Sequence, residues 1–196
     1  MSSPLPGPDG RPRCPWAAGP VTPPDYTAYH DEEWGQPVRE DAALFERLSL
    51  EAFQSGLSWL TILRKRAAFR IAFAGFDPAV VATFDADDEA RLLADAGIVR
   101  NRAKVAATIA NARAVLALDR PLSELLWSFA PPARGPAPRV TEDVPALTPE
   151  SSAMAKALRT QGFRFVGPTT AYALMQATGM VDDHLADCAF RRRRLR

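Results

Sequence analysis

The sequence lacks long apolar runs and has little net charge of either sign. No stretch of apolar residues is long enough to span a bilayer, which excludes a transmembrane helix. Segment 1–24 is rich in proline and glycine instead of apolar residues, so it is no secretory signal. With 47% hydrophobic residues, the 196-residue chain can bury the core of one globular domain. We therefore expect a cytoplasmic protein with no membrane partner.

The formal net charge of +1 is unevenly distributed. Five of the last six residues are arginines, so residues 1–190 carry a net charge of −4. Any affinity for nucleic acid must therefore come from local patches or from this tail. We treat 191–196 as a basic tail, which is either a solvated terminus or a further source of attraction to phosphates.

Cysteine and histidine are scarce, and they occur as two pairs at opposite ends of the chain. Cys14 and His30 lie near the N-terminus, and His184 and Cys188 lie near the C-terminus. The spacing of the second pair places two ligands on one face of a helix, and two cysteines with two histidines make a tetrahedral zinc shell. A disulfide, which a reducing cytosol disfavours, and four unrelated residues are the alternatives. A closed shell of four protein ligands would make such a zinc ion structural.

Apolar periodicity and capping residues predict an all-α fold. Residues 1–13 read as a disordered extension, 14–190 as a single helical domain, and 131–149, with six prolines, as an internal loop. We expect helices that begin at Asp41, Asp77 and Asp85, helices over 59–73 and 101–118, and helices from Ser151 or Ser152 to Gln161 and from Pro168 to Gly179. Residues 122–129 are expected to form a short apolar helix or a turn.

Glu51 is the residue most difficult to explain as part of an ordinary core. It lies in the apolar seam of its helix, where a carboxylate is costly unless it is paired or used. Aromatic residues near it in the sequence would form a pocket suited to a flat cationic ligand. The alternative is a salt-bridged glutamate among core aromatic residues. The aromatic residues are Trp16, Tyr26, Tyr29, Trp34 and Trp59.

Two turns could contact nucleic acid. Leu57, which follows Gly56, could insert into a stack of bases or into the core of the protein itself. Gly167 precedes a helix whose first turn contains Thr169, and free N–H groups there could bind a phosphate. An ordinary pair of helices with a glycine cap gives the same pattern.

Longer motifs resemble the 3-methyladenine DNA glycosylase I family, in order from about residue 13 to residue 188. The resemblance implies a helix-hairpin-helix fold, one structural zinc ion that joins the terminal segments, and a monomer that binds double-stranded DNA with alkylated bases. The motifs are Cys14-Pro-Trp16 and the segments 26–35, 50–59, 95–98, 111–113, 127–129, 162–167 and 183–188.

The resemblance also implies roles for single residues. Glu51 matches the carboxylate of the pocket, and with Tyr29 it is a candidate catalytic residue. Leu57, beside Gly56, matches the residue that fills the space left by a flipped nucleotide. Gly167 and Thr169 match the hairpin that contacts the DNA backbone. The zinc ligands would be Cys14, His30, His184 and Cys188, and the residues around the base would be Tyr26, Tyr29 and Trp59, with Trp16 as a further wall.

The implied reaction is the hydrolysis of the N-glycosidic bond of 3-methyladenine in base-excision repair, which leaves an abasic site. Methylation makes this base cationic, so its bond to the sugar is already weak. No carboxylate lies between Phe163 and Met180 and the hairpin has no lysine, so neither the aspartate of larger relatives nor a lysine nucleophile is expected. Ala52 and Phe53 depart from the family pattern, which keeps other alkylated purines open as substrates. A zinc-stapled DNA-binding module without catalysis is the second alternative, and it would not need Glu51.

Overall fold

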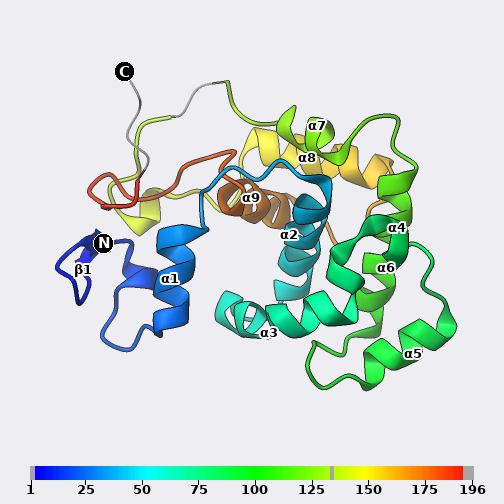
Figure 1. Cartoon of the computed structure of the whole chain (residues 1–196). Coiled ribbons are helices and arrows are strands. Elements are labelled where there is room, and N and C mark those ends of the chain that lie inside the picture. The colour runs from blue at the N-terminus through cyan, green and yellow to red at the C-terminus, as the bar shows by residue number, and fades with distance from the viewer. Residues whose placement is uncertain (1–2, 133–134, 192–196) are drawn as a thin grey trace.

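The computed structural model describes residues 3–132 and 135–191 (Figure 1). The described part of the chain is mostly helical, which confirms the predicted fold class. A short antiparallel pair of strands, β1 (Leu5–Pro6) and β2 (Pro12–Arg13), precedes the helices. The α-helices are α1 (Pro24–Glu32), α2 (Asp41–Gln54), α3 (Trp59–Ala72), α4 (Pro78–Val81), α5 (Ala86–Ala94), α6 (Arg102–Leu116), α7 (Leu122–Trp127), α8 (Pro149–Thr160) and α9 (Pro168–Ala177), with 3-10 helices at Pro15–Ala17, Ala74–Phe76 and Thr141–Asp143.

Helix α2 is the centre of the molecule. It packs against α3, α6, α7 and α9, and Figure 1 shows it between α9 and α3. Leu44, Leu48 and Phe53 of α2 are fully buried, and they belong to one continuous apolar core. Because α2 is surrounded by other helices, its C-terminal end is held firmly, and this end carries Glu51 and the turn that contains Leu57.

Several helices have a side-chain N-cap at the residue that the sequence predicts. The carboxylate of Asp77 accepts a hydrogen bond from the N–H of Ala79, and Asp85 and Asn101 cap α5 and α6 in the same way. Each cap satisfies a backbone N–H that has no partner within its helix.

One predicted helix cap and one predicted helix start are wrong, although α2 begins at Asp41 as expected. Asp41 does not cap α2; its carboxylate accepts hydrogen bonds from the N–H groups of Leu122 and Ser123 and therefore caps α7. Helix α8 begins at Pro149, with Thr148 as its cap, instead of at Ser151 or Ser152. In both cases the sequence offers several capping residues, and tertiary packing selects among them.

The prediction of a disordered segment at 1–13 is wrong for its described residues, 3–13. The strands β1 and β2 pair, and the guanidinium of Arg13, which is 4% exposed, binds the carboxylates of Asp9 and Asp31. The N–H of Ala189 donates to the carbonyl of Pro12, so this ribbon also contacts the C-terminal segment. Charge pairing and backbone hydrogen bonds thus order a stretch that has little apolar surface to bury.

The basic tail begins as part of the folded domain. The guanidinium of Arg191 donates to the carbonyls of Asp182 and His184, so the domain extends at least one residue beyond the predicted boundary at 190. The other residues of the predicted tail, 192–196, lie outside the described residues.

Candidate active site and metal centre

A cavity of about 280 Å³ lies between α1, α2, α9 and the C-terminal segment. The structure brings all five predicted pocket residues to its wall, although they come from four different helices of the first 59 residues. These residues are Trp16, Tyr26, Tyr29, Glu51 and Trp59.

Glu51 is buried in the wall of this cavity, and none of the described residues forms an ion pair with it. The residue is 6% exposed, and among the described residues no hydrogen bond or salt bridge reaches its carboxylate. Burial raises the pKa of Glu51 to about 8, against an opposing effect of the positive charge of Arg47. The alternative of a salt-bridged glutamate therefore does not describe this site.

The cationic side chain near Glu51 is engaged elsewhere. Arg47 donates to the carboxylate of Glu33 at 2.8 Å, and Arg66 donates to the same carboxylate. Burial of Glu33 opposes its ionisation, but these two guanidinium groups outweigh the burial and lower its pKa to about 2. Glu33 is thus the carboxylate that both arginines bind, and among the described residues Glu51 is left available to a ligand.

Aromatic rings form the rest of this wall. The rings of Tyr29 and Trp59 lie 5.3 Å apart, and those of Trp16 and Tyr26 lie 5.0 Å apart. Burial raises the pKa of Tyr29, so its hydroxyl stays protonated at neutral pH. The indole N–H of Trp59 is buried and has no hydrogen-bond partner among the described residues. Trp59, which has an unused donor, and Glu51, which has an unused carboxylate, therefore both line one aromatic cavity, and this lining suits a flat polar ligand.

Another part of the wall contains polar residues that the sequence analysis did not select. Asp183 lines the cavity, and its Oδ2 accepts hydrogen bonds from Tyr172 at 2.6 Å and from Gln176 at 2.8 Å. Gln176 and Ala173 both line the cavity, and their spacing of three residues on α9 was the available signal for a shared face. Gln54, one turn after Glu51, lines the cavity as well.

The departure from the family pattern at Ala52 and Phe53 does not alter the cavity wall. Phe53 is fully buried, and its ring packs against those of Phe69 and Phe73 at 4.6 and 6.0 Å. Ala52 is 5% exposed. From this stretch of α2 it is Glu51 and Gln54 that line the cavity, so the substitutions change the core behind it.

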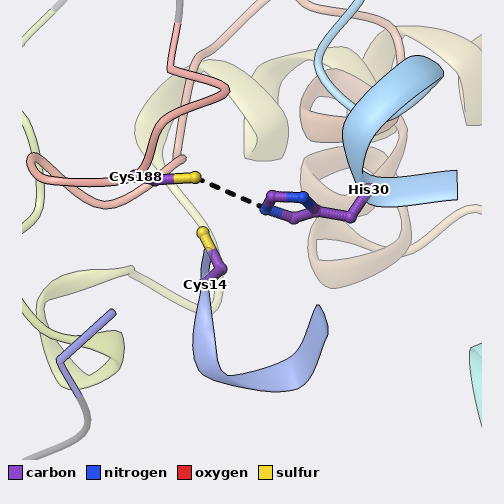
Figure 2. A group of neighbouring side chains, drawn as sticks. All are labelled: Cys14, His30 and Cys188. Carbon is purple, nitrogen blue, oxygen red and sulfur yellow. Dashed lines mark hydrogen bonds between the residues drawn. The ribbon is translucent and has the colours of Figure 1, made fainter. Parts of the chain in front are cut away.

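Three of the four predicted zinc ligands meet next to the cavity. The ligand atoms of Cys14, His30 and Cys188 lie within 4.8 Å of one another, and all three residues are buried (Figure 2). His30 comes from α1, while the cysteines come from the two terminal segments of the chain. Both cysteines are free thiols, so the alternative of a disulfide does not apply. Cys188 Sγ lies 3.6 Å from His30 Nε2, and the Cys14 thiol and His30 lower the pKa of Cys188.

His184, the fourth predicted ligand, lies beside this group. Its ring centroid is 4.9 Å from that of His30, and its Nε2 is buried without a hydrogen-bond partner among the described residues. Its Nδ1 lies 3.0 Å from the carboxylate of Asp182, and His30 Nδ1 lies 2.8 Å from Asp31. Each carboxylate fixes the proton on Nδ1 and leaves Nε2 as an acceptor, which is the usual arrangement of histidines that bind metal. The donor set therefore suits a zinc ion.

The two turns selected from the sequence are exposed. Leu57 is 42% exposed, on the turn between α2 and α3, where Gly56 adopts a φ of +82°. Gly167 is the N-cap of α9 and makes no side-chain cap, and Thr169 is exposed in the first turn.

In the described part of the chain, no helix has the length and hydropathy that crossing a membrane requires.

A helical domain with an unpaired carboxylate in an aromatic cavity and exposed turns beside it has the architecture of a DNA glycosylase, an enzyme that takes a single base into a pocket. The chain belongs to the methyladenine glycosylase family, whose model matches residues 16–192.

Similar proteins agree with this assignment. DNA-3-methyladenine glycosylase 1 of Escherichia coli K12 is 44% identical over 184 residues, which cover 90% of this chain and 95% of that protein. DNA-3-methyladenine glycosylase of Haemophilus influenzae is 43% identical over 181 residues, which cover 90% and 96%. A crystal structure of 3-methyladenine DNA glycosylase I has a TM-score of 0.87 and 42% identity, over 92% of this chain and 100% of the other. The 3-methyladenine DNA glycosylase I of Staphylococcus aureus has a TM-score of 0.87 and 34% identity, over 92% and 98%.

Proposed function

We propose that the protein is a monofunctional DNA glycosylase that hydrolyses the N-glycosidic bond of 3-methyladenine in alkylated double-stranded DNA. The observation that carries this proposal is the buried, unpaired carboxylate of Glu51 in an aromatic cavity. The relatives of this chain carry the same activity in their names. Such an enzyme would act as a monomer in the cytoplasm, with access to the chromosome.

The cavity would act on the cationic base in two ways. The rings of Tyr26, Tyr29 and Trp59 stack on or edge the flat base, while Glu51 accepts hydrogen bonds from it and balances its positive charge. Unmodified adenine has no such charge and keeps a strong bond to its sugar, so it gains less from the same pocket. Selectivity then follows from the weakness of the bond together with the fit of the base.

Glu51 and Tyr29 are the proposed catalytic residues, because both face the position that the base would occupy. Glu51 stabilises the positive charge of the base during its departure, and the protonated hydroxyl of Tyr29 can donate a hydrogen bond. Trp16 and the indole N–H of Trp59 would complete the recognition of the base edge.

The exposed turns would bind the duplex. Leu57, with Gly56 beside it, would fill the space left in the stack when the nucleotide flips out. Gly167 and Thr169 would hold a DNA phosphate at the first turn of α9, where backbone N–H groups have no capping side chain. This assigns the α8–α9 pair as the helix-hairpin-helix element of the enzyme.

One structural zinc ion would be held by Cys14, His30, His184 and Cys188. When bound, it supplies four bonds that close a loop of about 170 residues and so stabilise the folded state. Cys14 and Leu185 also line the cavity, so the ligand segments form part of the wall of the base pocket. We therefore expect the metal site to maintain the shape of the pocket without taking part in the chemistry.

The decisive experiment incubates the purified protein with methylated duplex DNA and identifies the released bases by chromatography. Release of free 3-methyladenine, with 7-methylguanine retained and the strands intact, supports a narrow monofunctional enzyme. Release of several alkylated purines would favour the broader alternative. A protein that binds DNA but releases no base would overturn the proposal in favour of a DNA-binding module.

A further inference from the structure

Two buried polar side chains of α6 bind the two exposed turns to which the proposed function assigns DNA contacts. Lys104 and Asn111 are 6% and 1% exposed, so neither is available to touch DNA itself. They are seven residues apart on one helix, and seven residues return to nearly the same face after a rise of about 10 Å. One face of α6 thus carries two polar side chains, those of Lys104 and Asn111, at a fixed separation.

Lys104 anchors the turn that presents Leu57. Its ammonium donates to the carbonyl of Phe53 at 2.8 Å and to the carbonyl of Ser55 at 2.6 Å. Both carbonyls lie at the C-terminal end of α2, where carbonyl groups have no partner within the helix and the helix dipole favours a cation. The ammonium therefore fixes the path of the chain immediately before Gly56 and Leu57.

Asn111 anchors the hairpin between α8 and α9. Its side-chain amide donates to the carbonyl of Arg164 at 3.1 Å and accepts from the N–H of Arg164 at 2.7 Å. The next residue, Phe165, has a φ of +56° and is 44% exposed. A bulky residue in this region of backbone conformation is strained and persists when its surroundings hold it there. The paired hydrogen bonds of Asn111 provide such a constraint at Arg164, three residues before Gly167.

We propose that α6 is a rigid spacer whose Lys104 and Asn111 hold the Leu57 turn and the 162–167 hairpin at the separation that duplex DNA requires. This proposal rests on the proposed function, because it assumes that the two turns contact DNA. Both residues are positioning residues, since each acts through a turn and neither touches the substrate. The packing of α6 against α2, α4 and α5 gives the spacer its rigidity.

The test compares affinity for duplex DNA with affinity for the free base. The probes are a duplex with one tetrahydrofuran abasic site and free 3-methyladenine, the latter measured by tryptophan fluorescence. We expect Lys104→Met and Asn111→Leu each to weaken duplex binding about tenfold and to leave binding of the base within about twofold. Lys65→Met is the matched control, because Lys65 also donates to two backbone carbonyls. These are the carbonyls of Ala96 and Gly97, and neither residue is near the Leu57 turn or the 162–167 hairpin in the sequence.

Double variants separate this proposal from the proposed function. If Lys104 acts through Leu57, the pair Lys104→Met and Leu57→Ala binds the duplex no more weakly than Leu57→Ala alone, whereas the losses from Asn111→Leu and Leu57→Ala add. Additive losses from Lys104→Met and Leu57→Ala, or an equal loss from Lys65→Met, would overturn the spacer. A Leu57→Ala protein with unchanged duplex binding would instead contradict the part of the proposed function in which Leu57 fills the space left by the flipped nucleotide.

Discussion

The Nδ1 of His184 lies 3.0 Å from Oδ1 of Asp182, and this contact leaves the Nε2 of the same ring as the atom that can bind a metal. His30 and Asp31 repeat the arrangement at 2.8 Å. Two histidines from opposite ends of the chain thus have the same tautomer, each set by an acidic residue close to it in the sequence. The carboxylates orient the rings before any metal binds, which lowers the cost of assembling the site.

Replacement of Asp182 by asparagine should weaken zinc binding while all four proposed ligands remain. The amide has no negative charge to hold the proton on Nδ1, so we expect the affinity for zinc to fall about 10- to 100-fold. Competition with a chromophoric chelator measures this affinity. Asp187→Asn is the control, because Asp187 is an exposed carboxylate in the same segment. Equal zinc affinities for the two variants would contradict the role of Asp182.

Replacement of Glu51 by glutamine should stabilise the protein at alkaline pH. Burial raises the pKa of Glu51 from its ordinary 4.5 to about 8, so folding favours the protonated form. The folded state therefore loses stability as the pH rises from about 4.5 to about 8, and the full loss is on the order of 5 kcal/mol. Glutamine stays neutral, so the Tm of the variant should exceed that of the wild type by an amount that grows from pH 5 to pH 9.

The control for this experiment is Glu46→Gln. Glu46 is a buried carboxylate of the same helix, but it is paired with Arg70 at 2.8 Å. Removal of its charge takes a partner from Arg70, so this variant should not gain stability with rising pH. A Tm difference between Glu51→Gln and the wild type that is the same at every pH would contradict the burial argument.

The catalytic activity of the enzyme should rise with pH, whereas its stability should fall. A cationic base binds best to the ionised carboxylate, so kcat/KM for excision of 3-methyladenine should rise with pH and level off above about 8. Glu51→Gln should be about 10- to 100-fold slower with a flat profile, because a neutral amide gives a weaker hydrogen bond to a cation. The same carboxylate thus lowers stability and raises activity at alkaline pH. An identical profile in the variant would assign the ionisation to another group.

The sequence predicts this site better than it predicts the shape of the fold around it. Glu51 stands out because an acidic residue in an apolar helical seam needs a reason, and the physics of burial alone marks it. The wall made by Gln176 and Asp183 carries a weaker signal: the spacing of Ala173 and Gln176 indicates a shared face of α9, but only the packing of α9 against α2 shows that this face lines a cavity. Local chemistry can be read from one segment, whereas a cavity between segments depends on how they pack.

Tertiary contacts also explain the errors in the predicted elements. Asp41 is an acceptable cap for its own helix, and only the folded chain shows that its carboxylate serves α7 instead. Arg13 lies in a proline- and glycine-rich stretch that reads as disordered, yet it binds Asp31 of α1, 18 residues away. Both contacts join segments that are separate in sequence, so periodicity and propensity within either segment cannot predict them.

Replacement of Leu57 by alanine should reduce excision from duplex DNA more than binding of the free base. Loss of the side chain leaves the gap in the base stack unfilled, so the flipped state is less stable, and we expect kcat/KM to fall about tenfold. Ile71→Ala is the matched control. Ile71 is an aliphatic residue on α3 that is 84% exposed, so its replacement by alanine removes a similar apolar surface. Single-turnover excision from duplex and from single-stranded DNA measures the effect. Because a single strand has no opposite base stack to refill, the defect should be confined to the duplex, and an equal loss on both substrates would show that Leu57 supports the pocket instead of the flipped state.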